Sequence, residues 1–149
     1  MTIRTLTPAL SVSPQIDPAD VAALAASGFR SIVCTRPDGE EAGQPTAAAV
    51  AAAAEAQGVR FLHIPVVSGT IDESDAAAMA RALAELPGPV LAYCRSGARS
   101  EQLAAMTAAR GEGGGIARYD ILVIGGGSAG IATAASILRR RPDVSLAIV

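Results

Sequence analysis

The chain has 149 residues, enough for one full hydrophobic core with some length left over, and 50% of its residues are hydrophobic. The formal net charge of -2 and the aromatic content of 3% argue against a nucleic-acid-binding protein, which needs basic patches and stacking side chains. Only two cysteines occur, far apart, and no basic, apolar leader opens the chain, so we expect a cytoplasmic protein rather than a secreted disulfide scaffold.

Short apolar runs alternate with alanine-rich segments along the first two thirds of the chain, which predicts a three-layer α/β domain with a parallel sheet. Helix starts are marked by polar caps with proline or acidic neighbours, and helix ends by glycine or proline. The expected strands are 29–34, 59–67 and 89–94, and the expected helices are 17–28, 45–58, 72–86 and 100–110.

A cysteine directly after the third expected strand is the strongest functional signal. Cys94 opens a short polar loop that leads into a helix, so free N–H groups of the helix start point back at the sulfur. These groups and the nearby arginines lower the pKa of a thiol and bind anions, which predicts a nucleophile, although an inert packing cysteine is the alternative. We expect Cys94 and Arg99 to be catalytic, and the anion to be bound by Arg95, Ser96, Gly97, Ala98 and Ser100.

Other candidate residues lie in the loops that follow the earlier strands. Arg36 and Asp38 are expected at the pocket rim, with Asp38 or Asp72 as a possible general acid; a solvated turn and a helix cap are the simpler explanations for the two aspartates. His63, the only histidine, is expected to be a core group, and we expect no metal site. Cys34 is expected to pack in the core, with resolution of an oxidised Cys94 as the alternative.

The composition changes after residue 110. We expect domain one at residues 1–110, a glycine-rich linker at 111–117, and a truncated βαβ fragment of the Rossmann type at 118–149. Gly125, Gly127 and Gly130 follow an apolar strand in the Gly-x-Gly-x-x-Gly pattern of dinucleotide sites. These glycines also interrupt the uncharged stretch 121–138, so we expect no membrane span.

The first domain resembles the phosphatase-like domain of beta-lactamase hydrolase-like proteins, which is related to dual-specificity phosphatases. The matching segments are Ser11-Val12-Ser13-Pro14-Gln15, Arg36-Pro37-Asp38-Gly39-Glu40, His63-Ile64-Pro65-Val66 and the loop 94–100. The C-terminal fragment, residues 118–149, resembles the start of sulfide:quinone oxidoreductase-like flavoproteins. That resemblance implies FAD or NAD(P) in a complete parent protein, a fused or partner flavoprotein, and no cofactor for the first domain.

Two departures from dual-specificity phosphatases favour a different reaction. Those enzymes place the arginine one position further from the nucleophile, and the shorter spacing from Cys94 to Arg99 resembles rhodanese-like sulfurtransferases. They also carry an aspartate after a strand such as 64–66, where this chain has Val67 and Ser68. We therefore expect a sulfurtransferase that moves sulfane sulfur through a Cys94 persulfide. The alternatives are a phosphatase acting on a phosphomonoester through a Cys94 thiophosphate, and a non-catalytic sulfur carrier or sensor for a fused flavoprotein.

Overall fold

The structure of the chain is a computed structural model that describes residues 2–113, 121–123 and 146–148. The contacts within the chain divide it into two units, Met1–Gly113 and Gly114–Val149. No helix of the described residues is both long and apolar enough to span a bilayer.

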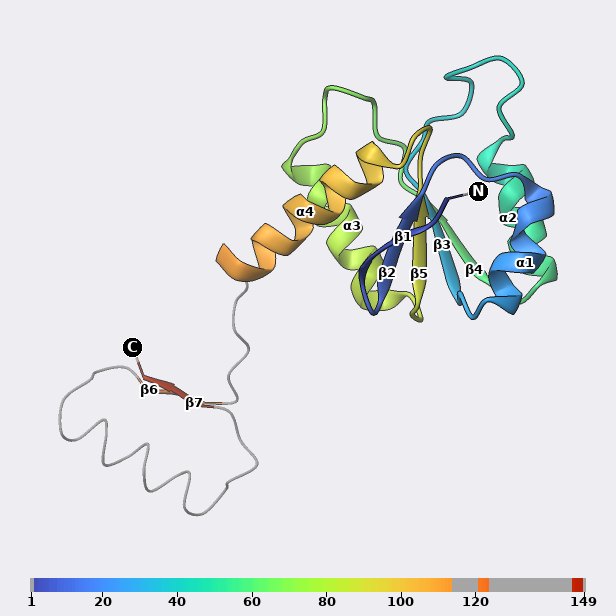
Figure 1. Cartoon of the computed structure of the whole chain (residues 1–149). Helices are drawn as coiled ribbons and strands as arrows, with labels where there is room; N and C mark the ends of the chain where they lie inside the picture. Colours follow the sequence, from blue (N-terminus) through green and yellow to red (C-terminus); the bar gives the residue numbers. More distant parts are fainter. Residues whose placement is uncertain (1, 114–120, 124–145, 149) are drawn as a thin grey trace. The chain divides into compact units, whose positions relative to one another are not determined.

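The first unit is built on a five-stranded mixed sheet (Figure 1). In spatial order its strands are β1 (Arg4–Thr7), β2 (Leu10–Ser13), β5 (Val90–Tyr93), β3 (Ser31–Cys34) and β4 (Arg60–His63). β5 is parallel to both β2 and β3, and β4 is parallel to β3, whereas β1 runs antiparallel to β2. The carboxyl ends of four strands therefore meet at one edge of the sheet, which is where parallel α/β sheets build their sites.

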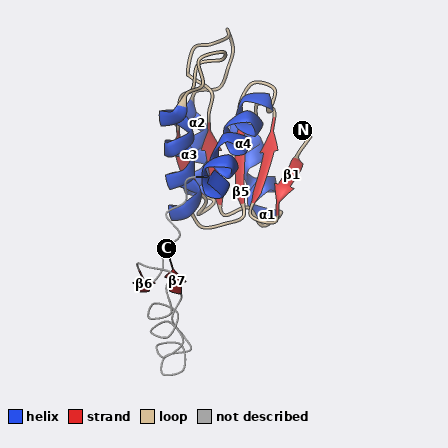
Figure 2. Cartoon of the chain, turned by 90° about the vertical axis from the view of Figure 1, so that its left-hand side faces the viewer, coloured by secondary structure: helices blue, strands red, loops and turns tan. Residues whose placement is uncertain are grey.

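Helices cover both faces of this sheet, as Figure 2 shows from the side. They are α1 (Val21–Ala26), which follows a short 3-10 turn at Pro18–Asp20, α2 (Ala47–Ala56), α3 (Glu73–Glu85) and α4 (Ala98–Gly113). One core cluster joins α1 and α2 to the sheet, and a second joins α3 and α4 to its other face. The predicted three-layer α/β class is confirmed.

Side chains of the central strands alternate between these two cores. Ile32 and Leu91 pack towards α1 and α2, while Val33 and Ala92 pack towards α3 and α4. A strand buried on both faces needs apolar residues at successive positions, which explains the uninterrupted apolar runs of β3 and β5. The end of β5 is thus fixed in the middle of the core, and Cys94 follows it directly.

The structure differs from the sequence prediction at the edges of the sheet. The sequence did not predict β1 or β2. β1 (Arg-Thr-Leu-Thr) is mostly exposed and has no apolar run, and the buried β2 (Leu-Ser-Val-Ser) has serine at every second position. The antiparallel β1 makes the sheet mixed rather than parallel. β4 ends at His63, and beyond it Val66 N–H donates a hydrogen bond to the carbonyl of Thr35 at 3.1 Å. Proline at position 65 has no N–H, which helps to end the regular ladder.

The second unit contains β6 (Ile121–Val123) and β7 (Leu146–Ile148), which pair in parallel with Ile121 opposite Leu146. The segment between them, with the predicted helix and with Gly125, Gly127 and Gly130, lies outside the described residues.

Candidate active site

The loop that carries the predicted nucleophile connects β5 to α4. It passes close to the end of β2, where the N–H of Cys94 donates to the carbonyl of Ser13 at 3.4 Å. Gly97 has a φ of 92°, and a Cβ atom added there would lie 3.3 Å from the carbonyl carbon and oxygen of Ser13. Both the backbone conformation and the close approach require glycine at position 97.

Cys94 lies at the base of this loop, and 1% of its surface is exposed. The N–H of Gly97 donates to its Sγ at 3.1 Å. Burial by itself raises the pKa of the Cys94 thiol, but backbone hydrogen bonds from Ser100, Ser96, Arg99 and Gly97 outweigh it and hold the pKa below its ordinary value. The main-chain amides of the loop therefore favour the thiolate, which is the nucleophilic form.

The Arg99 guanidinium is buried beside the loop and held by fixed partners. Nη1 donates to the carbonyls of Val66 at 2.8 Å and Thr35 at 3.4 Å, and Nη2 donates to Glu40 Oε1 at 2.7 Å. Its Nε is buried and has no hydrogen-bond partner among the described residues. A buried donor without a partner costs free energy, and an anion bound next to Cys94 would satisfy it.

A second buried arginine completes a charged network behind Arg99. Arg36 donates from Nε to Glu40 at 2.8 Å, from Nη1 to Gln15 at 2.8 Å and from Nη2 to Glu41 at 2.9 Å. Hydrogen bonding to Arg36 and then to Arg99 lowers the pKa of the Glu40 carboxyl, despite the opposing effect of burial. Glu40 is therefore ionised and shared by two arginines, a strong type of charge-assisted hydrogen bond.

Cys94 and Arg99 open onto a cavity of about 470 Å³. The other lining residues are Glu40, Ser68, Gly69, Ile71, Arg95, Ser96, Ala98 and Gln102. Arg95 stands at the outer end, with 65% of its side chain exposed, and its Nε lies 3.5 Å from Glu41 Oε2. The cavity thus combines a nucleophile, a row of amides and a guanidinium donor.

The structure brings most of the predicted loop residues together. Cys94, Arg95, Ser96, Ala98 and Arg99 line the cavity, while Gly97 shapes the loop beneath it. Ser100 is buried under the loop, and its hydroxyl lies 2.8 Å from the Thr35 hydroxyl.

Asp38, Asp72 and Arg36 do not line this cavity. Asp38 Oδ1 accepts a hydrogen bond from the N–H of Ala47 at 2.7 Å, at the start of α2. Asp72 is the N-cap of α3, where Oδ1 accepts from the N–H groups of Ser74 and Asp75. The Ser74 side chain and these amides lower the pKa of the Asp72 carboxyl. Both carboxylates thus accept hydrogen bonds from the first amides of a helix, Asp72 as the N-cap residue and Asp38 beside the N-cap Thr46 of α2. Arg36 is buried rather than at the cavity rim.

His63 and Cys34 lie near Arg36 and take no part in the cavity. His63 Nε2 lies 2.8 Å from the Arg36 carbonyl, and the Cys34 thiol donates to the same oxygen at 3.3 Å. Burial raises the pKa of the Cys34 thiol, so this sulfur is the less reactive of the two. In the described part of the chain, no group of three or more acidic, histidine or cysteine side chains is placed to hold a metal ion.

The sequence prediction missed Glu40, Gln15 and Thr35 as site residues. Glu40 and Gln15 stand in segments that carry the family resemblance, but nothing local shows that they meet Arg36. Thr35 directly follows the apolar strand β3, and its hydroxyl also donates to the carbonyl of Tyr93 at 3.2 Å.

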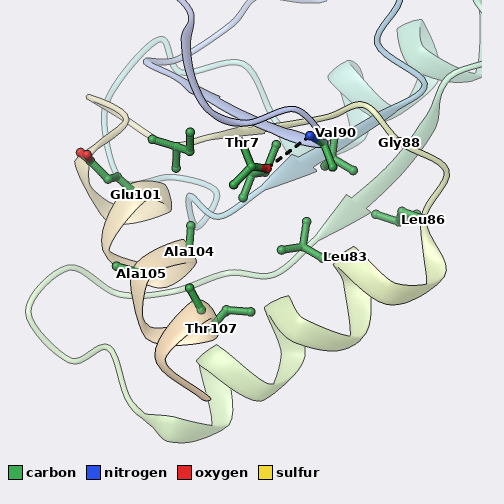
Figure 3. Close-up of a pocket in the computed structure, with 13 residues that line it drawn as sticks. Thr7, Leu83, Leu86, Gly88, Val90, Glu101, Ala104, Ala105 and Thr107 are labelled. Atoms are coloured by element: carbon green, nitrogen blue, oxygen red, sulfur yellow. Dashed lines mark hydrogen bonds between the residues drawn. The ribbon is translucent and has the colours of Figure 1, made fainter. Parts of the chain in front are cut away.

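A second, apolar cavity of about 520 Å³ lies at the opposite end of β5, between α3 and α4 (Figure 3). Leu83, Leu86, Ala104 and Ala105 contribute to its walls, and Glu101 is the only ionisable residue among those lining it. The N–H of Val90 donates to the carbonyl of Ala9 at 2.8 Å in this region. No nucleophilic thiol faces this cavity, so the chemistry is expected at Cys94.

The α/β sheet and the cysteine loop between its central strand and a helix fit the class of phosphatase-like domains, although Arg99 lies one position nearer to the cysteine than in dual-specificity phosphatases. Residues 2–111 match the family described as beta-lactamase hydrolase-like protein, phosphatase-like domain. The chain belongs to this family. The resemblance seen in the sequence is thereby confirmed for the first domain.

Beta-lactamase hydrolase-like proteins from two bacteria show the same relationship. The protein from Agrobacterium fabrum is 44% identical over 91 residues, which is 61% of this chain and 21% of that protein. The protein from Xylella fastidiosa is 40% identical over 98 residues, or 66% of this chain and 23% of that protein. The matched part is thus less than a quarter of the length of these relatives.

Solved structures share the fold. A protein proposed to be a phosphatase, from Neisseria meningitidis Z2491, is 33% identical with a TM-score of 0.69, covering 96% of this chain and 97% of its own. Another from Shewanella putrefaciens CN-32 has a TM-score of 0.63 at 18% identity, covering 94% and 82%. Pseudomonas aeruginosa TpbA in complex with phosphotyrosine has a TM-score of 0.56 at 23% identity, covering 74% and 64%.

These findings place the chain among phosphatase-like hydrolases, and the prediction of an enzyme of that class is confirmed. The main functional prediction, a rhodanese-like sulfurtransferase, is wrong, because the matched family and the solved relatives are phosphatase-like. The spacing from Cys94 to Arg99 was a poor criterion for the reaction. The shorter loop still directs the Gly97 amide at the sulfur and leaves a cavity beside it.

Proposed function

We propose that the domain is a cysteine-dependent phosphomonoester hydrolase. The observation that carries the proposal is the hydrogen bond from the Gly97 N–H to the Cys94 Sγ at 3.1 Å, in a cavity that is also lined by Arg99, whose Nε has no partner among the described residues. Rows of amides at a helix start bind phosphate, and a guanidinium fork binds phosphate oxygens. Membership of the phosphatase-like family supports the same chemistry.

Binding of the phosphate group follows from the positions of the donors. Arg99 Nε and the loop amides would hold the phosphoryl oxygens, and the fixed bonds of Arg99 to Glu40 and Val66 keep its guanidinium in place before the substrate arrives. Preorganised donors stabilise developing charge without a reorganisation cost. Ser96 and Ser100 would support the loop, and Arg95 would raise the positive potential at the cavity mouth.

The reaction then has two steps. The Cys94 thiolate attacks phosphorus, the bond from phosphorus to the leaving oxygen breaks, and that oxygen keeps the electron pair. A water molecule next attacks the thiophosphate, the S–P bond breaks, and inorganic phosphate leaves as the thiolate is restored. The lowered pKa of Cys94 serves both steps, since the thiolate is both the nucleophile and the second leaving group.

Hydrolysis of para-nitrophenyl phosphate by three proteins tests this proposal. We expect turnover by the wild type, none by Cys94→Ser, and turnover close to wild type by Cys34→Ser, the matched control at the chain's other cysteine. Vanadate, a phosphate mimic, should inhibit the wild type. Equal rates for the wild type and Cys94→Ser would overturn the proposal.

For the rest of the chain we keep the sequence-based proposals. Residues 1–110 would form the phosphatase-like domain, 111–117 a linker and 118–149 the start of a dinucleotide-binding unit of a fused flavoprotein. This last part rests on the glycine pattern, with FAD or NAD(P) as the implied cofactor of a complete parent, and on the parallel pairing of β6 with β7. A cytoplasmic location is supported by two cysteines that are both free thiols.

A further inference from the structure

The carboxylates around the cavity are all engaged in other interactions. Among the residues that line it, Glu40 is the only acid, and its two oxygens bind Arg36 and Arg99 at 2.8 and 2.7 Å. These arginines lower the pKa of Glu40. Glu40 therefore carries no proton at neutral pH, and it cannot give one to a leaving group.

The neighbouring acids are no better placed. Asp38 and Asp72 are helix caps outside the lining, and hydrogen bonds lower the pKa of Asp72. Glu41 pairs with Arg36 at 2.9 Å and with Arg95 at 3.5 Å, and it does not line the cavity either.

The cavity wall formed by the segment after β4 carries no acid. Ser68, Gly69 and Ile71 contribute to the lining. Thr70 closes a turn on Val67, because its N–H and its hydroxyl both donate to the Val67 carbonyl, at 3.2 and 3.1 Å. Apart from Cys94 and Glu40, the polar groups of the described residues that line the cavity are hydroxyl groups, amides and guanidinium groups, none of which is a general acid at neutral pH.

We infer that the substrate is a phosphoryl group on an oxygen that leaves without a proton from the protein, namely an aryl phosphate or a phosphoanhydride. This inference rests on the proposed function. When Cys94 attacks phosphorus, the leaving oxygen takes the electron pair, departs as an anion and then takes its proton from water. That departure is easy for an oxygen whose conjugate acid has a pKa of about 10, as in tyrosine, or about 6, as in a phosphate group.

An alkyl phosphate would be a poor substrate for the same reason. An alkoxide is nearly as basic as hydroxide, far more basic than a phenolate, and it needs a general acid to leave. Such an acid contributes about 10²- to 10⁴-fold to the rate. Without a general acid, the site hydrolyses aryl phosphates and phosphoanhydrides faster than phosphoserine-type esters, because their leaving oxygens are less basic.

A series of aryl phosphates with increasingly basic phenols tests this inference, with kcat/KM as the readout because it reports the steps up to loss of the phenol. We expect kcat/KM to fall at least tenfold from para-nitrophenyl to unsubstituted phenyl phosphate. We expect kcat/KM for the better of phosphotyrosine and inorganic pyrophosphate to exceed kcat/KM for phosphoserine by at least tenfold. Whichever of the two is hydrolysed faster shows whether the preferred leaving group is a phenol or a phosphate. A smaller difference in either comparison overturns the inference.

Asp72→Asn and Asp38→Asn are the control variants, since asparagine keeps the capping function. Both should leave the dependence on the leaving group unchanged. A selective tenfold loss with phenyl phosphate in either variant, with para-nitrophenyl phosphate unaffected, would identify that aspartate as the acid and overturn the inference. The proposed function fails separately, through Cys94→Ser retaining activity.

Discussion

Glu40 holds Arg99 in the cavity, with its Oε1 2.7 Å from Arg99 Nη2 while its other oxygen binds Arg36. The carboxylate thus fixes the guanidinium, whose buried Nε has no hydrogen-bond partner among the described residues. The two residues come from segments 59 positions apart in the sequence. This pair orients a buried arginine in the lining of the cavity that Cys94 shares, as the proposed phosphate binding requires.

Replacing Glu40 by glutamine removes the charge that orients Arg99. A hydrogen bond to a charged group contributes about 1.5 to 3 kcal/mol, so we expect kcat/KM for para-nitrophenyl phosphate to fall by about 10- to 100-fold. Steady-state kinetics with circular dichroism of the same preparation measure this. Glu55→Gln, on the exposed surface of α2, is the control, and a Glu40→Gln enzyme as active as that control would show that Arg99 is positioned without Glu40.

The same carboxylate makes stability depend on pH in a defined direction. The pKa of Glu40 is depressed in the folded chain, so its contribution to stability is present above its ordinary value of 4.5 and is lost as the pH falls through the folded value. We expect the difference in unfolding free energy between wild type and Glu40→Gln to shrink as the pH is lowered from 6 to 3. Denaturant titrations at a series of pH values test this; a difference that grows on acidification would contradict it.

Gly97→Ala tests the close approach of the loop to β2. A Cβ at position 97 would meet the Ser13 carbonyl at 3.3 Å, and the φ of 92° is itself unfavourable for alanine. We expect the loop to move and kcat/KM to fall by about 100-fold, the effect of losing a preorganised anion donor.

Gly28→Ala separates the effect of the positive φ from the effect of the contact with Ser13. Gly28 also has a positive φ of 95°, but an added Cβ would meet no atom within 4 Å. This variant should lose about 1 to 2 kcal/mol of stability and keep its activity. Equal activity of the two alanine variants would show that the contact with Ser13 does not matter.

Alkylation of Cys94 by iodoacetamide gives its pKa directly. The loop amides hold this pKa below the ordinary value of 9.0, so the alkylation rate should reach half of its plateau at a pH below 9.0 and fall as the thiolate takes up a proton. Cys34→Ser provides a protein with a single reactive thiol. A midpoint at or above 9.0 would mean that burial, rather than the amides, dominates at Cys94.

The central strands of the fold could be predicted because both of their faces are buried, as in β3 and β5, where every residue must be apolar or small. β1 could not, since an exposed edge strand of Arg-Thr-Leu-Thr has no apolar pattern to find. The loop after Cys94 was also predictable, because its donors are successive main-chain amides and depend on local sequence alone.

The rest of the site depends on tertiary contacts. The partnership of Arg36 with Glu40 and Gln15 joins three segments, and no local pattern reveals it. Asp38 and Asp72 were offered as acids because they lie in loops near the strand ends, yet each of those loops leads into a helix whose free N–H groups use the carboxylate. The length of the loop from Cys94 to Arg99 led to the wrong reaction, because loop length does not determine which main-chain amides reach the sulfur.

Mass spectrometry of the protein quenched during turnover of para-nitrophenyl phosphate tests the central claim most directly. We expect one phosphoryl group on Cys94 in the wild type and in Cys34→Ser, and none in Cys94→Ser. Turnover by the wild type with the phosphoryl group on another residue, or undiminished hydrolysis by Cys94→Ser, would contradict it.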